Sequence, residues 1–249
     1  MSFRSGLYRA QMAAYDAFDP GPAAPQLPLP PASFKPDPAI LARVLVQTAD
    51  ALEENPPARA KLVKLADNGD KLVQAAQAAA FGPDLPTLER LAGETGAALE
   101  ELLFFGRALA APYISRMIAA AGESAVPASP EARLCPYCGS EPGLSLIRGD
   151  TGYRFLVCSL CGQEWGFPRS KCPFCGTDSS LEIITEGAQA PRWIESCAQC
   201  QCYLKIVDQR RRGDQTALIP LVEAIQTLYL DFIAAKEGCQ PGLPYVALK

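Results

Sequence analysis

The stretch Cys158–Gly176, "CSLCGQEWGFPRSKCPFCG", contains two C-x-x-C pairs that are separated by ten residues. Two residues between cysteines form a tight turn that can present both sulfurs to one ion, and a glycine after the second cysteine supplies the positive φ that such a turn favours. Gly162 and Gly176 occupy this position. The chain has no histidine, so mixed Cys/His metal sites are excluded. The stretch therefore predicts cysteine knuckles that belong to metal sites.

Two further pairs flank this stretch, and the spacing of all four pairs favours two separate sites. The first and third gaps, of 19 and 21 residues, are close to the spacing of zinc ribbons. Each gap also predicts a hairpin whose second strand runs into the next knuckle, with strands at 144–147 and 153–157 and at 181–184 and 192–196. A crossed pairing stays open but would require longer loops. The predicted pairs of knuckles are Cys135/Cys138 with Cys158/Cys161 and Cys172/Cys175 with Cys197/Cys200.

A tetrahedral site of four sulfurs suits zinc or a single iron ion, and the sequence leaves this choice open. It also leaves open whether the two ions are structural or redox-active. Since two small hairpins bury little apolar surface, metal binding would supply their folding energy. Cys202 could replace Cys200 as a ligand but is better explained as a spare thiol, and Cys239 is given no role. The predicted ligands are Cys135, Cys138, Cys158, Cys161, Cys172, Cys175, Cys197 and Cys200.

Composition argues against several classes of function. The net charge of −4 and the pI of about 5.1 argue against nucleic acid as the main partner. The sequence has no apolar run of membrane-spanning length and no secretory signal at its start, which predicts a cytoplasmic protein without a membrane span. Without histidine, the commonest general base is missing, and no phosphate-binding or nucleophile motif is present. We therefore expect a protein that is not an enzyme.

The pattern along the chain predicts an α+β multidomain protein: an N-terminal helical domain, two rubredoxin-like or zinc-ribbon modules with four cysteines each, and a C-terminal helix. Leu7–Phe18 could be helical, and Pro112 is expected to kink or interrupt the helix that contains it. Leu221, Ile225, Leu228 and Phe232 share one face of the last helix, which is expected to pack on the core. The predicted segments are a proline-rich arm at 1–36, the helical domain at 37–121, metal modules at 134–166 and 167–207, and the C-terminal helix at 217–238.

The segments "GYRFLVCSLCGQEWGFPRSKCPFCG" (152–176) and "CAQCQCYLKIVD" (197–208) resemble the formate dehydrogenase accessory protein FdhE family. The family shares four C-x-x-C motifs, a C-S-L-C-x-x-E-W segment leading to R-x-K-C, and C-x-x-C-x-x-Y-L-K. These motifs stand here at Cys158–Trp165, Arg169–Cys172 and Cys197–Lys205, and "LYLDFIAAKEGCQPGLP" (228–244) resembles the family's C-terminal helix. The sequence departs from the family at Gln201, which replaces the glycine of the fourth knuckle, and in a short, proline-rich N-terminal region.

The resemblance implies a cytoplasmic maturation factor that binds the catalytic subunit of formate dehydrogenase and is needed for its activity. It also implies two rubredoxin-like modules. Iron is a bound metal reported for the family, and the eight knuckle cysteines would be its ligands. Two alternatives stay open. One is a rubredoxin-like electron-transfer protein. The other is a zinc-ribbon module that binds nucleic acid through the basic residues Arg148, Arg154, Arg169, Lys171 and Arg210–Arg212.

Two hypotheses concern the metal modules themselves. If the modules are independent, replacing Cys158 and Cys161 by Ser should empty one site and leave the other filled. Trp165 is expected to pack beside the first site as a structural cover rather than to form part of a partner surface.

Overall fold

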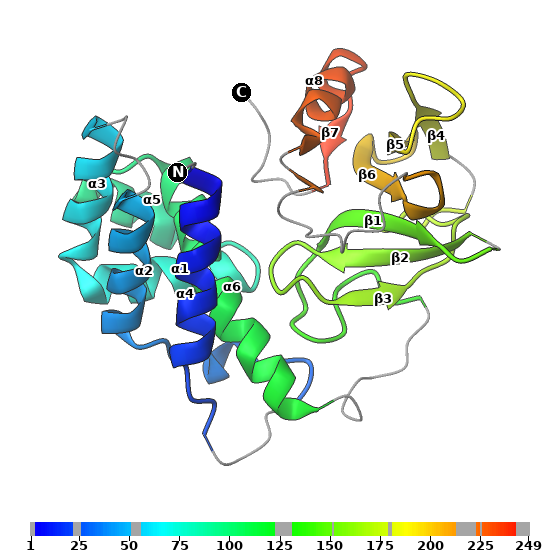
Figure 1. Cartoon of the computed structure of the whole chain (residues 1–249). Coiled ribbons are helices and arrows are strands. Elements are labelled where there is room, and N and C mark those ends of the chain that lie inside the picture. Colours follow the sequence, from blue (N-terminus) through cyan, green and yellow to red (C-terminus); the bar gives the residue numbers. More distant parts are fainter. Residues whose placement is uncertain are drawn as a thin grey trace. The chain divides into compact units, whose positions relative to one another are not determined.

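The structure is a computed structural model that describes residues 3–21, 26–50, 56–122, 131–150, 152–178, 181–212, 223–224 and 226–242. It divides into two compact units, Met1–Val126 and Pro127–Lys249 (Figure 1). The first unit is helical and the second is built on a sheet, which confirms the predicted α+β architecture. The predicted linker at 122–130 lies almost wholly outside the described residues.

The helical unit is a bundle in which α4 packs on α6, and α2 lies between α1 and α3. Gly106 allows the close approach of α4 and α6, because a Cβ at this position would lie 2.6 Å from the Ala75 carbonyl oxygen. Large side chains such as Leu45, Leu88 and Leu109 fill the core. The helices are α1 (Phe3–Ala17), the short 3-10 helix η1 (Pro31–Ser33), α2 (Pro38–Asp50), α3 (Pro56–Ala66), α4 (Gly69–Ala80), α5 (Leu85–Thr95) and α6 (Leu99–Ala121).

The predicted N-terminal arm at 1–36 is divided differently in the structure. Its first part is helix α1, which packs on α2 and α6 and so belongs to the helical unit. The proline-rich part also lies against this unit, since Phe34 is buried and its ring meets the ring of Tyr113 edge-on, with centroids 5.0 Å apart. The described part of the arm is therefore a component of the helical unit.

Pro112 does not interrupt α6, so the interruption, one of the two outcomes expected from the sequence, does not occur. A proline inside a helix removes the N–H that would bond to the carbonyl four residues earlier, here Ala108. The side chain of Gln11 on α1 donates its Nε2–H to this carbonyl at 2.8 Å. The helix continues because a neighbouring helix satisfies the acceptor that the proline leaves free.

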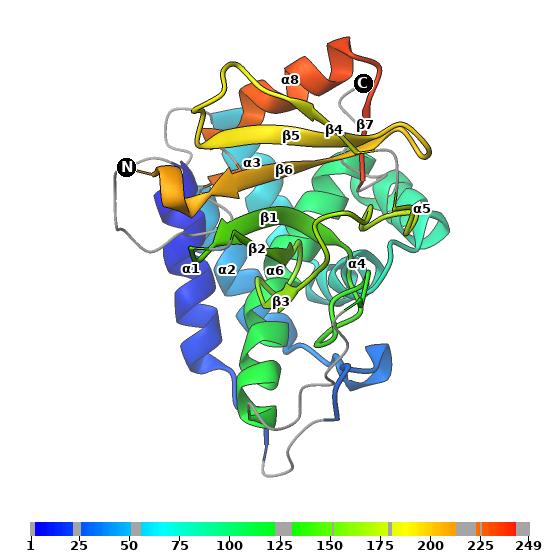
Figure 2. The ribbon, with the colours of Figure 1, turned by 90° about the vertical axis from the view of Figure 1, so that its right-hand side faces the viewer.

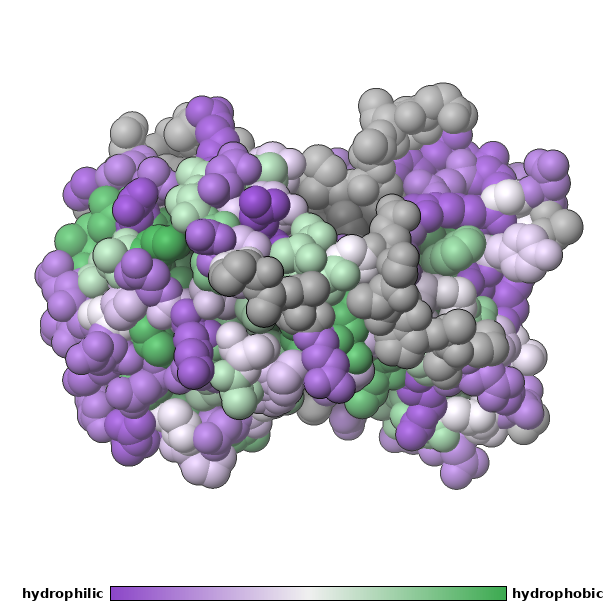
Figure 3. All heavy atoms as spheres, turned by 90° about the horizontal axis from the view of Figure 1, so that it is seen from below, coloured by the Kyte–Doolittle hydropathy of each residue, from purple (hydrophilic) through white to green (hydrophobic). Residues whose placement is uncertain are grey.

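Helix α6 is long and apolar enough to cross a bilayer by length and composition, although half of that stretch is buried within the structure. The core helix of a globular unit has the same properties. Figure 3 shows hydrophilic and hydrophobic residues interspersed over the visible face of the helical unit. We interpret α6 as the central helix of this unit because it packs on α4, α1 and α5.

The second unit is a seven-stranded sheet with the order β3-β2-β1-β6-β5-β4, and β7 pairs with β6 (Figure 2). The two predicted hairpins are confirmed as β1–β2 and β4–β5. The strands are β1 (Pro142–Arg148), β2 (Tyr153–Cys158), β3 (Glu164–Gly166), β4 (Leu181–Ile184), β5 (Arg192–Cys197), β6 (Cys202–Asp208) and β7 (Gln240–Pro241), and the 3-10 helix η3 (Gln209–Arg211) follows β6.

The two hairpins are joined into one sheet by a parallel pair of strands, β1 and β6, with Ser145 opposite Ile206 and Ile147 opposite Asp208. Strand β6 follows the fourth knuckle and also pairs antiparallel with β5. The predicted metal modules therefore share one continuous ladder of backbone hydrogen bonds. They are neighbours in a single unit rather than separate bodies.

The C-terminal helix α8 (Leu228–Lys236) lies over β5 at the side of the sheet (Figure 2), and the first part of the predicted helix at 217–238 lies outside the described residues. Leu230 and Ala234 pack on Ile194 of β5. Leu221 and Ile225 of the predicted stripe lie outside the described residues. Leu228 and Phe232 are 45% and 60% exposed, so the expectation that these two side chains pack on the core is wrong. The buried face of α8 is instead formed by Leu230 and Ala234, an i, i+4 pair that lies two positions after Leu228 and Phe232.

Candidate metal centres

The first cluster consists of the thiols of Cys135, Cys138, Cys158 and Cys161, all of which are buried. The first two lie in the turn before β1, and the other two lie where β2 ends. The Cys138 sulfur is 3.5 Å from each of the sulfurs of Cys158 and Cys161, and the sulfurs of Cys135 and Cys161 are 3.6 Å apart. The sequence prediction that the first two knuckles pair is confirmed.

The backbone of these knuckles curls around the sulfurs. In the first knuckle the Cys135 N–H donates to the Ser140 carbonyl at 2.8 Å, and in the second the Cys158 N–H donates to the Gln163 carbonyl at 2.9 Å. The amides of Leu160 and Cys161 each point at the Cys158 sulfur, at 3.4 Å. Such amides partly offset the negative charge of a thiolate.

The second cluster consists of Cys172, Cys175, Cys197 and Cys200. Its sulfurs are 3.8 Å apart between Cys172 and Cys200 and 3.7 Å apart between Cys175 and Cys197. Cys172 and Cys197 are buried, whereas Cys175 is exposed and Cys200 is partly exposed. The second pairing of knuckles is therefore confirmed as well, and this cluster is the more accessible of the two.

The geometry of both clusters fits a tetrahedral ion. A Zn–S bond of about 2.3 Å gives sulfur–sulfur edges of about 3.8 Å in a regular tetrahedron. The observed distances of 3.5 to 3.8 Å lie near this value. All ten cysteines are free thiols, and Cys202 and Cys239 belong to neither cluster. The donor set therefore suits zinc or a single iron ion at each cluster.

Burial explains why these thiols need a cation. It raises the pKa of the Cys158 thiol well above its usual range, and it raises the pKa of Cys172 to about 11. Four thiols packed this closely cannot all ionise without a compensating positive charge. A divalent ion would supply that charge and hold the thiolate form.

The fourth knuckle has Gln201 at the position that glycine occupies in the other three. Its φ is +57°, the left-handed region, close to the values at Gly139, Gly162 and Gly176. The backbone role is the same, because the Gln201 N–H donates to the Cys197 carbonyl at 2.7 Å. This departure from the family pattern therefore leaves the turn intact and strains one residue.

We predict that Gln201→Gly stabilises the metal-loaded protein. A left-handed conformation costs a non-glycine residue roughly 1–2 kcal/mol, and the lower entropy of the unfolded glutamine chain offsets part of this. The expected gain is up to about 1 kcal/mol. Denaturant unfolding measures it, and a loss of stability would show that the exposed glutamine side chain has a role in the turn.

The exposure of Cys175 predicts that a chelator removes the second ion first. A competing ligand can reach the second cluster at Cys175, whereas all four sulfurs of the first cluster are buried. We expect two kinetic phases of metal release, and the variant Cys172→Ser/Cys175→Ser should lack the fast phase. Release monitored with a chromogenic chelator measures both phases; a fast phase that survives in this variant would contradict the assignment.

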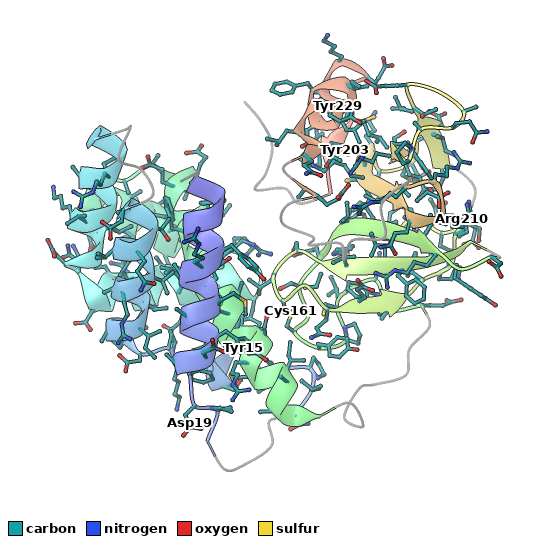
Figure 4. The ribbon with its side chains drawn as sticks, in the orientation of Figure 1. Tyr15, Asp19, Cys161, Tyr203, Arg210 and Tyr229 are labelled. Atoms are coloured by element: carbon teal, nitrogen blue, oxygen red, sulfur yellow. The ribbon has the colours of Figure 1, made fainter. Side chains whose placement is uncertain are left out.

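The residues that carry the family resemblance outside the knuckles make internal contacts. Glu164 accepts two hydrogen bonds from Arg148, and the buried Trp165 donates its Nε1–H to the Ala132 carbonyl at 2.7 Å. Tyr203 on β6 lies under α8 and donates to Asp231 at 2.8 Å, while Lys205 binds Asp231 at 2.8 Å (Figure 4). The expected packing role of Trp165 is supported, and the Y-L-K motif anchors α8.

The basic residues of the nucleic-acid alternative also have internal partners. Arg148, Arg154 and Lys171 form ion pairs with Glu164, Glu195 and Glu131 respectively. Arg210 and Arg211 bind Asp208, a wholly buried carboxylate whose pKa is lowered by the hydrogen bond from Arg210. Arg212 lies 3.6 Å from Glu223. Within the described residues, Arg169 alone among the seven has no carboxylate within ion-pair distance.

Sequence reasoning missed the buried ion pair between the two hairpins. Arg154 on β2 lies 2.7 Å from Glu195 on β5, and the arginine side chain is only 1% exposed. Arg154 also donates to Ser145 and to the carbonyl of Lys171, next to the second cluster. No local pattern could have indicated this pair, because it depends on how the two hairpins join.

Comparison with known proteins finds similarity to one family in part of the chain. The model of the FdhE central domain matches residues 134–169. The FdhE homolog from Aquifex aeolicus is 38% identical over 110 residues, which cover 42% of this chain and 38% of that protein. The homolog from Pseudomonas aeruginosa is 34% identical over 146 residues, which cover 54% and 45%.

The fold extends the similarity beyond these matched segments. The crystal structure of the FdhE protein from Pseudomonas aeruginosa has a TM-score of 0.62 and 25% sequence identity, and the match covers 96% of this chain and 86% of that chain. By sequence, the chain spans less than half the length of the curated relatives it matches. The predicted resemblance to the FdhE family is confirmed, and the common fold includes the helical unit that sequence motifs could not align.

Proposed function

We propose that this chain, which carries an FdhE central domain within the FdhE fold, is a non-enzymatic maturation factor that binds the catalytic subunit of formate dehydrogenase in the cytoplasm. The observation that carries the proposal is the pair of four-cysteine clusters in a family named for formate dehydrogenase. The subunit would require this binding to become active.

The eight knuckle cysteines would hold two metal ions, one in each module, with the modules bounded as predicted at 134–166 and 167–207. Each ion, when bound, would supply folding energy that the small hydrophobic core does not. A closed set of four cysteine ligands leaves no coordination position for a substrate, which favours a structural role. The role of the metal modules is then to present a folded surface. Within the described residues, no other group of cysteine or carboxylate side chains has ligand geometry.

Recognition of the partner would use residues other than the family motifs. Glu164, Tyr203 and Lys205 are committed to internal contacts with Arg148 and Asp231. Six of the seven basic residues are likewise paired with neighbouring acids, which disfavours the nucleic-acid alternative and its requirement for free phosphate-binding cations.

One observation favours the second candidate, electron transfer of the rubredoxin type. Cys175 is exposed, so a redox partner could approach the second cluster through one of its sulfurs. An iron-loaded protein with a reversible potential would support this function. A protein that is isolated without oxygen with zinc alone, and without visible absorption, would exclude it.

The test of the proposed function is an affinity capture from the cytoplasm of the cells in which this protein naturally occurs. The tagged chain is expressed with formate dehydrogenase induced, the cells are lysed without oxygen, and co-purifying proteins are identified by mass spectrometry. Three baits are compared: the native chain, Cys172→Ser/Cys175→Ser, and Cys239→Ser as a matched control outside both clusters.

We expect the catalytic subunit with the native chain and with Cys239→Ser, and its loss with the double variant. A capture that lacks the subunit with the native bait contradicts the proposal. Equal recovery of the subunit with all three baits would support the binding but show that it does not depend on the second metal site. Normal formate dehydrogenase activity in cells without this chain would also contradict the maturation role.

A further inference from the structure

Phe174 lies between the two cysteines of the third knuckle and joins three parts of the sheet unit. Its N–H points at the Cys172 sulfur at 3.4 Å. Its carbonyl accepts a hydrogen bond of 2.8 Å from Arg133, which stands two residues before the first ligand of the other cluster. Its ring packs against Gly242 beyond α8: a Cβ built at Gly242 would lie 1.9 Å from the ring's Cζ.

The segment Gln240–Gly242 touches the fourth knuckle as well as the third. The Gln240 N–H donates to the Gln201 carbonyl at 2.8 Å, and the Gly242 N–H donates to the Tyr203 carbonyl at 3.3 Å. Strand β7 therefore continues the sheet beside β6 with Cys202 opposite Gln240. This short segment rests on one residue from each knuckle of the second cluster, and we name it the clasp.

Helix α8 is anchored by contacts that do not involve the knuckles. Helix α8 is tied to β6 through the contacts of Asp231 with Tyr203 and Lys205, and Leu230 packs on Ile194. The clasp pairs with β6, and its backbone and ring contacts go to residues 174, 201 and 203, two of which lie in the third and fourth knuckles. Its simultaneous contact with both knuckles depends on how these are held together.

We propose that metal binding at the second cluster closes the clasp, and that the clasp in turn strengthens metal binding at this cluster but not at the first. The proposal rests on the proposed metal-binding role. Its basis is that an ion would join the cysteines of the third knuckle to those of the fourth, in addition to the β4–β5 hairpin that pairs Leu181 with Cys197, while the clasp spans residues of both knuckles. Two events that stabilise the same arrangement must favour each other by the same factor.

The first arm of the test measures protection of the clasp by hydrogen exchange and mass spectrometry on the full chain loaded with zinc. Metal content is determined in parallel by elemental analysis. In Cys172→Ser/Cys175→Ser we expect the peptide that contains residues 239–242 to exchange about tenfold faster or more than in the native chain. The core of α8 around Leu230 should remain protected.

The second arm leaves every cysteine in place. Gly242→Ala would place its Cβ 1.9 Å from the ring of Phe174, so the ring and the clasp must move apart and the contact between the clasp and the third knuckle is lost. We expect zinc affinity at the second cluster to fall about tenfold in competition with a chromogenic chelator, with the first cluster unchanged. Gly187→Ala is the matched control, because its Cβ meets no atom within 4 Å and its φ is not positive.

The outcomes separate the two proposals. A native chain that holds fewer than two ions contradicts the metal-binding role itself. A native chain with two ions whose clasp exchanges at the same rate with the second cluster filled or emptied contradicts the clasp proposal alone. Equal zinc affinity of Gly242→Ala and Gly187→Ala at the second cluster overturns it in the same way.

Discussion

Removal of the metal ions is expected to unfold the sheet unit while the helical unit stays folded. Among the residues that the structure describes, the hydrophobic clusters of the sheet unit around Leu146, Ile194 and Ile206 hold three or four buried residues each. Structural zinc sites contribute about 10–16 kcal/mol of apparent binding free energy, which is folding free energy in such modules. The helical unit has its own core and none of the cysteines.

The position of the tryptophans makes this prediction easy to measure. The two tryptophans, Trp165 and Trp193, both lie in the sheet unit and are both buried. Their fluorescence should shift to the red on chelation, while the helical signal in far-ultraviolet circular dichroism should be largely retained. Zinc added back should reverse the shift. An unchanged fluorescence, or a simultaneous loss of both signals, would contradict the separate roles of metal and core.

Glu195→Gln is expected to have the second-largest effect, a loss of roughly 3 kcal/mol in the free energy of unfolding. The substitution leaves the guanidinium of Arg154 without its countercharge, in a side chain that is 1% exposed. The 15% exposure of Glu195 places the loss at the lower end of the range for buried pairs. Burial also raises the pKa of Glu195, so keeping this carboxyl group ionised costs free energy.

The measurement is denaturant unfolding of the zinc-loaded protein, followed by tryptophan fluorescence. The double variant Arg154→Met/Glu195→Gln should recover most of the loss, because it removes the stranded charge. Glu131→Gln is the matched control: this carboxylate is 61% exposed in its pair with Lys171, and its loss should cost less than about 1 kcal/mol. Equal effects of the two single variants would contradict the importance of the buried pair.

The metal clusters could be predicted from the sequence because their determinants are local. Each knuckle needs only its two cysteines and a residue with positive φ, and each hairpin is closed by short-range pairing. The spacing of the cysteines then restricts which knuckles can meet. Gln201 shows the limit of this reasoning, since the turn keeps its geometry without the glycine that the pattern expects.

The junction of the two modules could not be predicted, because it depends on contacts between distant segments. The parallel pairing of β1 with β6 joins residues about sixty positions apart, and such pairing leaves no local signature. Arg154 of the first module, and Glu131 and Arg133 just before it, all contact residues of the second module. The prediction of independent modules is therefore best tested with Cys158→Ser/Cys161→Ser: an unchanged second cluster would confirm it, and weaker metal binding there would show coupling through the shared sheet.

The C-terminal helix shows a different limit. Leu228 and Phe232 have the spacing of a core-facing stripe, yet Leu230 and Ala234 form the buried face. Apolar residues of this short helix lie on every side of it, so the periodicity of the sequence cannot identify which side packs on the sheet. The deciding contact is polar: Asp231 accepts hydrogen bonds from Tyr203 and Lys205 and fixes the rotation of the helix.

The most direct test of the account is X-ray absorption at the metal edge, combined with elemental analysis, on the full chain purified without oxygen. We predict two ions per chain, each bound by four sulfurs at about 2.3 Å, with no nitrogen or oxygen in the coordination sphere. The same spectrum distinguishes iron from zinc. One ion or none per chain, or a mixed sulfur and oxygen shell, would contradict the two four-cysteine sites from which the proposed function proceeds.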